Sequence, residues 1–353
     1  MTEKIKIIVV DDSAFMRKSL SIILASDPGI EVIATAKDGL EGVELVKKLK
    51  PDLVTLDIEM PRMDGLTALK KIMKDNPVPV IMVSSLTTEG ADSTLKALEL
   101  GAVDFIPKEM SFVSVNIVNI KEDLIKKVKA IVKQRIFRTR LSNLTGNRRE
   151  QSFRKETGGT LPRMLYKSIA IGISTGGPLS LQKLVPKLIH NINCPVFIVQ
   201  HMPPKFTKSL ADRLNSMSSL TVVEAEDNSE VKKNTVYIAP GGSHMKVMKN
   251  GFGAPKIKIT DLPSDTLHRP SVDVTLDSIV DVYGKQTLGV IMTGMGKDGL
   301  EGIKKLKALG GRAIAQDEES CVVYGMPKAI VDNNLADVIL PLEKISESIN
   351  KVF

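Results

Sequence analysis

The chain is organised around residues 169–177, which read IAIGISTGG. An apolar run leads to Gly172, Ser174 follows two residues later, and two more glycines come next. The run predicts a buried strand, the glycines permit a tight turn, and residues 179–190 then follow a helical pattern. Residues 172–176 match the G-x-S-x-G turn, which exposes a serine hydroxyl beside backbone N–H groups. A glycine-rich turn that binds phosphate or only packs tightly is the alternative, and the motif alone leaves both interpretations open.

The length of 353 residues predicts about two domains. Hydrophobic residues make up 42% and charged residues 25%, which is ordinary for a soluble protein with sizeable cores. The net charge of +8 permits contact with nucleic acid or a membrane surface without requiring it. Cys194 and Cys321 form no spacing motif, so we expect buried, inert thiols in a reducing compartment. The first apolar run is too short for a signal peptide and none approaches the ~20 residues of a membrane span, so we expect a cytoplasmic protein without membrane insertion.

Apolar runs alternate with helical patterns five times in the first 120 residues. The runs cover residues 5–10, 31–36, 53–57, 80–84 and 102–106, and the helical stretches between them cover 15–25, 40–49, 65–73 and 93–100. Repeated strand–helix units of this length predict a doubly wound parallel sheet with helices on both faces. Ligands of such sheets bind at the carboxyl ends of the strands.

Polar residues gather at those predicted strand ends, namely Asp11, Asp12, Asp57, Ser84 and Lys108. Three carboxylates in one cleft repel each other unless a cation neutralises them, and Mg²⁺ fits because it prefers oxygen ligands. A lysine and a hydroxyl opposite them suit a phosphoryl group on one carboxylate, because its oxygens need donors and positive charge. Any one of these aspartates could instead cap a helix or be solvated, but all five residues together favour a site.

These residues, together with the segment DIEMPRMDG at 57–65, resemble the receiver domain of two-component response regulators over residues 1–122. The resemblance implies a flavodoxin-like five-stranded domain in which Asp57 accepts a phosphoryl group from a histidine kinase. It also implies that Asp11, Asp12 and Asp57 hold Mg²⁺.

The same resemblance implies a switch formed by Ser84, Phe105 and Lys108, which couples phosphorylation to the surface. The family usually has proline directly after this lysine, whereas Glu109 follows it here. We therefore expect the peptide bond after Lys108 to be trans, since cis bonds before other residues are rare.

Residues 123–163 are expected to form a linker, helical at first and then flexible. A helical pattern runs from Lys121 to about Leu141, and residues 142–160 are rich in small and polar residues that cannot bury a core. Seven arginines and six lysines lie between residues 121 and 163. We interpret the segment as a solvated cationic tether, with attraction to an acidic partner as the alternative. The charges lack the regular aromatic interleaving of a nucleic-acid stacking platform.

Residues 164–353 predict a second α/β domain with a larger sheet. The predicted strands are 168–173, 196–199, 221–225, 235–239, 288–292, 312–315 and 337–340, and the predicted helices are 179–190, 206–216, 274–282, 299–309 and 326–333. A hairpin-like insertion is expected around residues 246–259.

A nucleophilic Ser174 needs a base, and the chain has four histidines. His190 is expected at a helix end, where it would interact with the helix dipole. His201 directly follows the predicted strand 196–199, and consecutive strands tend to be neighbours, so His201 is favoured over His244 and His268. A histidine in a loop is often structural, and the residues alone leave this choice open.

The glycine-rich segment 293–299 follows another apolar strand and supplies a candidate acid, Asp298. Asp298 could cap the helix that follows it. It could instead accept a hydrogen bond from His201 Nδ1–H and so fix the imidazole tautomer. The N–H of Met295, in a glycine-flanked turn, could donate to an oxyanion.

Residues 169–177, 200–203, 268–273 and 293–299 together resemble the catalytic domain of chemotaxis protein-glutamate methylesterases, the CheB family. The order Ser, His, Asp differs from that of α/β-hydrolases, so the turn motif does not imply that fold, and we expect a Rossmann-like domain. The resemblance implies the site residues Ser174 (nucleophile), His201 (base), Asp298 (its partner), Met295 and Thr175 (backbone donors to the oxyanion), and His268 and Thr293 (near the site).

The resemblance further implies a phosphorylation-regulated hydrolase that demethylates glutamate γ-methyl esters on methyl-accepting chemoreceptors and deamidates glutamines. No cofactor is expected at the esterase site, and a chemotaxis histidine kinase is the expected phosphodonor. We expect the receiver to cover the catalytic strand ends until it is phosphorylated. Two other classes are a receiver fused to a nucleic-acid-binding output domain and one fused to a nucleotide-binding domain, but neither a helix-turn-helix nor a phosphate-loop motif is recognisable.

Overall fold

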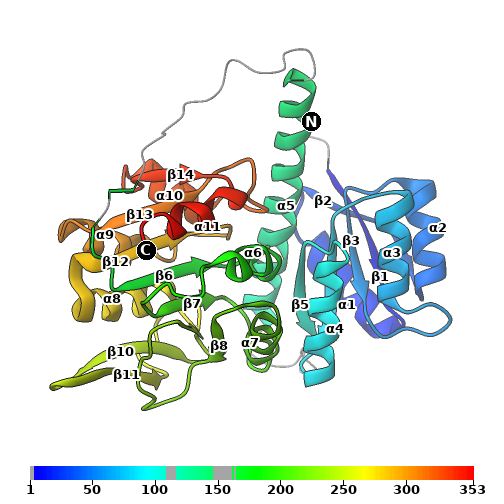
Figure 1. Ribbon diagram of the computed structural model, residues 1–353. Coiled ribbons are helices and arrows are strands. Elements are labelled where there is room, and N and C mark those ends of the chain that lie inside the picture. The colour runs from blue at the N-terminus through cyan, green and yellow to red at the C-terminus, as the bar shows by residue number, and fades with distance from the viewer. Residues whose placement is uncertain (1–3, 109–116, 146–160, 163) are drawn as a thin grey trace. The chain divides into compact units, whose positions relative to one another are not determined.

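The computed structural model describes residues 4–108, 117–145, 161–162 and 164–353. The chain divides into two compact units, Met1–Asn143 and Leu144–Phe353 (Figure 1). The peptide bond between Lys108 and Glu109 and residues 146–160 of the expected linker lie outside the described residues.

The first unit is a five-stranded parallel sheet with the strand order β2-β1-β3-β4-β5. Its strands are β1 (Ile5–Val10), β2 (Ile30–Ala36), β3 (Leu53–Asp57), β4 (Val80–Ser85) and β5 (Asp104–Lys108). Its helices are α1 (Ala14–Ala25), α2 (Gly39–Leu49), α3 (Gly65–Asp75), α4 (Thr88–Glu99) and α5 (Ile117–Thr145). This order is that of flavodoxin-like folds, which confirms the predicted fold class.

Helix starts in this unit follow from side-chain caps. Ser13, Asp38, Asp64 and Thr87 each accept a hydrogen bond from a backbone N–H three residues on. The cap at Thr87 explains why α4 begins at Thr88, five residues before the predicted start, although its first turn is polar.

Helix α5 extends beyond its predicted length at both ends. Leu124, Val128 and Ile131 are buried, and Lys129 forms an ion pair with Asp27 at 2.5 Å. The part of this helix from Leu124 to Ile131 is therefore packed within the first unit.

The second unit contains a seven-stranded parallel sheet with the order β14-β13-β12-β6-β7-β9-β8. Its strands are β6 (Ser168–Ile173), β7 (Val196–Gln200), β8 (Thr221–Glu224), β9 (Thr235–Ile238), β12 (Thr287–Ile291), β13 (Arg312–Gln316) and β14 (Val338–Leu340). Its α-helices are α6 (Gly177–Leu184), α7 (Phe206–Met217), α8 (Val272–Tyr283), α9 (Leu300–Ala308), α10 (Met326–Asp332) and α11 (Leu342–Asn350). The larger second sheet and its strands are thus confirmed, whereas α11 was not predicted.

Helices cover both faces of this sheet. Helices α8, α9 and α10 share a core with one face, and α6, α7 and α11 pack together on the other. The chain leaves β6 through α6 towards β7, and it leaves β12 through α9 towards β13. The connections diverge between β6 and β12, and ligands of open α/β sheets bind at such a point.

The expected hairpin is present as β10 (His244–Asn250) and β11 (Gly253–Thr260), an antiparallel pair outside the main sheet. Helix α6 ends at Leu184, and a short 3₁₀ turn with Pro186 follows. His190 is consequently an exposed residue of a turn, and its predicted place at a helix end is wrong. Among the described residues, no helix is both long and apolar enough to cross a membrane.

Candidate functional site

Ser174 and His201 lie at the carboxyl ends of two neighbouring strands. β6 and β7 pair with Ile173 opposite Gln200, so Ser174 and His201 each follow the last paired residue. The His201 N–H donates to the Ile173 carbonyl at 3.2 Å. Because paired strands lie about 4.8 Å apart, the two side chains leave the sheet edge from adjacent backbone positions. On the other side of β6, the Ser174 N–H donates to the Thr293 carbonyl at 2.9 Å.

Gln200 connects the backbones that carry these two side chains. It is buried, and its Nε2 donates to the carbonyl oxygens of Ser174 (3.0 Å) and His201 (3.1 Å). A Cβ at Gly177 would lie 1.8 Å from Gln200 Oε1, and Gly176 has a φ of +75°, which favours glycine. Gly177 therefore leaves room for the Gln200 amide, and Gly176 permits the left-handed backbone just before α6.

Asp298 lies at the N-terminus of α8. Four donors meet its carboxylate: the N–H groups of Val272 (2.7 Å), Asp273 (3.0 Å) and Gly299 (3.1 Å), and the Ser271 hydroxyl (3.0 Å). Helix N-termini stabilise negative charge through such N–H groups. Helix α9, which follows Asp298 in sequence, has no side-chain cap, so the alternative prediction that Asp298 caps it is wrong.

The imidazole of His201 is bound to Asp298 through Nε2, at 2.8 Å from Oδ2. The prediction that Nδ1 makes this bond is therefore wrong. The backbone of His201 is fixed at the end of β7 and Asp298 is fixed at α8, so the outer ring nitrogen reaches the carboxylate. Nδ1 is buried and has no hydrogen-bond partner among the described residues.

Electrostatics keep Asp298 ionised. Burial raises the pKa of its carboxyl, but the bond to His201, the charge of His201 and the N–H groups of α8 outweigh burial and hold the pKa well below its usual range. Burial raises the pKa of the adjacent Asp273 to about 6, and the negative charge of Asp298 adds to this rise. The negative charge beside His201 therefore resides on Asp298.

Of the two remaining histidines, His268 contacts His201 and His244 contacts the turn before α8. The ring of His268 stacks on that of His201, with centroids 4.1 Å apart and planes at 23°, so His268 lies beside His201. His244 is buried, accepts a hydrogen bond from the Ser271 N–H at Nδ1 (3.2 Å), and has a pKa lowered mainly by burial. It supports the turn before α8.

Two backbone N–H groups in the loops next to Ser174 are without a hydrogen-bond acceptor among the described residues. The N–H groups of Met295 and Thr175 donate no hydrogen bond within the described part of the chain. The buried hydroxyl of Thr293 donates to the Thr175 carbonyl at 3.0 Å and accepts from the N–H groups of Val322 (3.0 Å) and Val323 (3.1 Å). Thr293 thereby connects three loops at the end of the sheet.

Sequence reasoning did not assign Gln200, Ser271 or the start of α8 to the site. The G-G pair after Ser174 carried a signal for Gln200, because one glycine makes room for its amide. Segment 268–273, which includes the turn before α8, contributed to the family resemblance, but its contact with Asp298 is formed only in the folded domain.

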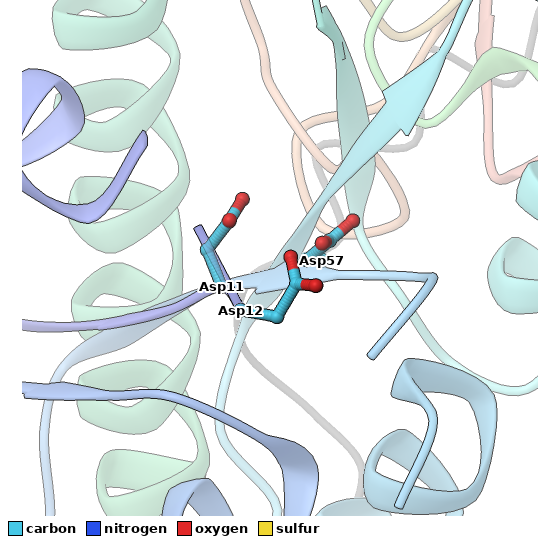
Figure 2. Close-up of side chains that lie close together, drawn as sticks. All are labelled: Asp11, Asp12 and Asp57. Atoms are coloured by element: carbon cyan, nitrogen blue, oxygen red, sulfur yellow. The ribbon is translucent and has the colours of Figure 1, made fainter. Parts of the chain in front are cut away.

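In the first unit, Asp11, Asp12 and Asp57 point towards one another at the ends of β1 and β3 (Figure 2). One carboxylate oxygen of each lies within 4.8 Å of the other two. Lys108 Nζ lies 2.6 Å from Asp57 Oδ2 and 3.4 Å from Asp11 Oδ2. The oxygen-only donor set fits Mg²⁺, which prefers carboxylate ligands and retains waters.

Burial raises the pKa of Asp57 to about 6 despite the opposing bond to Lys108, and it also raises the pKa of Asp11. Burial lowers the pKa of Lys108, but the two carboxylates outweigh it, so the pKa is raised and the ammonium stays charged. A single ammonium beside two buried carboxylates leaves net negative charge, which a divalent cation would neutralise.

The predicted switch residues lie on β4 and β5. The Ser84 hydroxyl accepts a hydrogen bond from Thr94 Oγ1 at 2.7 Å and donates to the Gly90 carbonyl at 3.1 Å. Phe105 is buried, and its carbonyl accepts from Lys127 Nζ at 3.3 Å. These bonds connect the ends of the two strands to α4 and α5.

The fold and the two sites define a class of protein: a receiver-type α/β domain joined to an α/β domain with a Ser–His–Asp cluster at its sheet edge. A family model described as CheB methylesterase matches residues 169–349, and a response regulator receiver domain model matches residues 7–116. This chain belongs to the CheB methylesterase family. The second domain is therefore a methylesterase domain, and the two alternative predictions, a nucleic-acid-binding and a nucleotide-binding output domain, are wrong.

Similar proteins match along nearly the whole chain. A Pyrococcus horikoshii protein named protein-glutamate methylesterase/protein-glutamine glutaminase is 47% identical over 353 residues, 99% of this chain and 94% of that protein. A Thermotoga maritima protein of the same name is 46% identical over 357 residues, 99% of each chain. The crystal structure of the Thermotoga maritima CheB methylesterase catalytic domain matches with a TM-score of 0.52 and 47% identity, covering 54% of this chain and 100% of that chain.

Proposed function

We propose that this chain hydrolyses γ-methyl esters of glutamate residues on chemoreceptors, releasing methanol, and deamidates glutaminyl residues at the same site. Ser174 is the nucleophile, His201 the general base and Asp298 its partner. Relatives with about half of their residues identical, over nearly the whole chain, carry the names of both activities, which supports the choice of substrate.

The free Nδ1 of His201 is the observation that carries this proposal. Its Nε2 lies 2.8 Å from Asp298 Oδ2, and that carboxylate also accepts N–H bonds from α8, so in the neutral ring the proton lies on Nε2 and Nδ1 presents a lone pair. Nδ1 is buried without a hydrogen-bond partner among the described residues, and the Ser174 hydroxyl likewise makes no hydrogen bond there. The backbone register supplies Ser174 as the neighbouring hydroxyl.

The reaction then follows a double displacement. Ser174 Oγ forms a bond to the ester carbonyl carbon while its proton moves to His201 Nδ1. The imidazolium gives that proton to the methoxy oxygen as the carbon–oxygen bond breaks and methanol leaves. Water attacks the acyl-serine with His201 again taking a proton, and the proton returns to Ser174 Oγ as glutamate is released. With a glutaminyl substrate the leaving group is ammonia.

Charge that develops on the carbonyl oxygen needs donors. We assign this role to the N–H groups of Met295 and Thr175, because both lie in loops next to Ser174 and have no other hydrogen-bond partner in the described part of the chain. Such donors act strongly in a site from which water is excluded. Thr293 and His268 would position these loops and the imidazole.

We further propose that a chemotaxis histidine kinase phosphorylates Asp57 and so regulates the esterase. Asp11, Asp12 and Asp57 would hold Mg²⁺, which when bound neutralises the carboxylates and the incoming phosphoryl group. Lys108 would contact a phosphoryl oxygen, and Ser84 and Phe105 would carry the change to the surface. With these partners, we propose that the enzyme acts in the cytoplasm.

The test is methanol release from methylated receptor, with and without a small phosphodonor and Mg²⁺. Wild type should release methanol faster after phosphorylation. Ser174→Ala should lower the rate by about 10⁴–10⁶, as loss of a nucleophile does in comparable triads. Ser219→Ala, which removes the hydroxyl of an exposed serine in the turn between α7 and β8, is the matched control and should retain activity. Full methanol release by Ser174→Ala would overturn the assignment.

A further inference from the structure

The β10–β11 hairpin carries positive charge that the proposed reaction does not use. Residues 244–260 contain four lysines and no aspartate or glutamate. Lys246 lies directly opposite Lys258, and Lys256 lies opposite Met248. Like charges in directly opposed positions destabilise a sheet. Asp227 offsets the charge of Lys258 at 3.1 Å, whereas Lys246 has no ion-pair partner among the described residues.

Lys246, Lys256 and Lys258 lie on the outer face of the hairpin, and Lys249 lies at the register shift of β10. Met245, Val247 and Ile257 are buried in the domain core, and side chains of a strand alternate between faces, so Lys246 and Lys256 lie on the opposite face.

Nearby acidic residues neutralise little of this charge. Asp227 pairs with Lys258 at 3.1 Å, and Glu230 meets Lys256 only through a backbone bridge. In the part of the chain that the structure describes, the side chains of Lys246, Lys249 and Lys256 form no ion pair.

Exposed apolar side chains accompany the lysines. Phe252 occupies the hairpin tip between two glycines and is fully exposed, and Met248 is 47% exposed. We call Lys246, Met248, Lys249, Phe252 and Lys256 the hairpin surface. An exposed aromatic ring at a projecting tip has no packing role in the folded chain.

Exposed lysines and apolar side chains are also found beside the hairpin, around a cavity. Ala254 and Pro255 line a cavity of about 520 Å³ together with Leu165, Lys167 and Lys233, among other residues. Leu165 is 69% exposed, and both of these lysines are exposed. Figure 1 shows the free end of the hairpin on the side of the domain where β6 begins, whereas Ser174 follows the end of β6. The base of the hairpin, at His244, contacts the turn before α8.

We propose that the hairpin surface docks on an anionic lipid bilayer, with Phe252 inserted at the interface and the lysines among the headgroups. Aromatic side chains favour the bilayer interface, and lysines are attracted to anionic leaflets. A fluid bilayer closes around a projecting side chain, whereas a folded acidic protein would need a pocket shaped for it. The contact is peripheral and differs from a spanning segment.

The test is co-sedimentation of the full chain with vesicles of phosphatidylcholine alone or mixed with phosphatidylglycerol. Wild type should bind only the mixed vesicles, and added salt should weaken binding because it screens the charges. Each lysine near such a surface contributes about fivefold to binding, so Lys249→Gln with Lys256→Gln should weaken binding roughly 25-fold. Phe252→Ser should weaken binding several-fold and leave the salt dependence unchanged.

The matched control is Lys47→Gln with Lys48→Gln on α2, which removes the same charge from an exposed helix of the other unit. Equal losses in the control and the hairpin variant would mean attraction by net charge and overturn the proposal, as would absence of vesicle binding. Retention on polyglutamate without vesicle binding would assign the surface to an acidic protein instead. Methanol release from receptor fragments should be unchanged in all variants, so the outcome does not depend on the esterase assignment.

Discussion

The orientation of one imidazole decides which atoms of the second domain can react. His201 is fixed by its own N–H at the end of β7, by Asp298 at Nε2 and by the stacked ring of His268. A ring fixed in this way cannot exchange its two nitrogens without breaking the bond to Asp298. In the proposed reaction Nδ1 would therefore be the base, beside an Asp298 carboxyl whose pKa is lowered.

Asp298→Asn tests this orientation. The amide lacks the charge that stabilises the imidazolium and favours the wrong tautomer, so kcat should fall about 10⁴-fold in the methanol assay. Asp281→Asn, on the exposed side of α8, is the control and should leave kcat unchanged. A kcat for Asp298→Asn within tenfold of wild type would show that Asp298 does not act through His201.

Gln200 gives a second prediction for a single residue. Gln200→Glu replaces the Nε2 donor by an oxygen that repels the carbonyls of Ser174 and His201. Misplacement of the nucleophile by about 1 Å lowers kcat roughly 100-fold, while KM should change little. Gln200→Met, which removes the donors without adding charge, should show a smaller loss of the same kind. A rise in KM with unchanged kcat would place Gln200 in substrate binding instead.

The acidic pocket predicts a pH dependence. The pKa of Asp57 is raised to about 6, so below that pH the carboxyl is protonated and must lose a proton to bind Mg²⁺. The affinity of the full chain for Mg²⁺, measured by calorimetry, should fall roughly tenfold for each pH unit below about 6. Asp57→Asn should remove this step. An affinity that stays constant across this range would contradict the raised pKa.

The raised pKa of Asp57 also makes the folding stability of the metal-free chain depend on pH. Because the folded-state pKa of Asp57 lies above the ordinary value of 3.8, the folded chain binds more protons than the unfolded chain between these values. Asp57 therefore contributes stability at low pH that is lost as the pH rises towards about 6.

Among the elements, α8 is the one on which the site depends most. Its first N–H groups bind Asp298, and its approach to β6 requires Gly172, where a Cβ would lie 2.4 Å from Val272 Cγ1. The same close approach therefore fixes both the core and the acid.

Gly172→Ala should separate α8 from β6. Overpacking of this kind costs about 1–3 kcal/mol, which should appear as a lower Tm together with a lower kcat because Asp298 moves. The control is Gly253→Ala in the hairpin, where the nearest atom is the mobile end of the Asn250 side chain at 3.0 Å. Equal Tm values for Gly172→Ala and wild type would contradict the close packing.

For the whole molecule, the division into two units suggests how phosphorylation reaches the esterase. We propose that the tether gives the receiver a high effective concentration for covering the catalytic strand ends. The fragment 160–353 should therefore release methanol faster than the unphosphorylated full chain and should not respond to a phosphodonor. A fragment no faster than the full chain would exclude inhibition by the receiver.

Much of this architecture could be predicted because strand periodicity and strand ends are local signals. The runs before Asp57, Ser174 and His201 all became strands, and the parallel-sheet rule placed the polar residues at one edge in each domain.

The features that the sequence did not predict, or predicted wrongly, depended mostly on contacts between distant segments. No local sequence pattern encodes three of these contacts. They are the bond of His201 Nε2 to Asp298, the bonds of Gln200 to the two carbonyls, and the bonds of Asp298 to the first N–H groups of α8. Pro186 did carry a local signal, and it ended α6 before His190.

The central claim is that Ser174 and His201 act as one unit. The most direct measurement is methanol release by Ser174→Ala, His201→Gln and the double variant, each compared with wild type. We predict that the double variant is about as slow as either single variant, because a nucleophile and its base contribute nothing without each other. Losses that multiply in the double variant would contradict the claim.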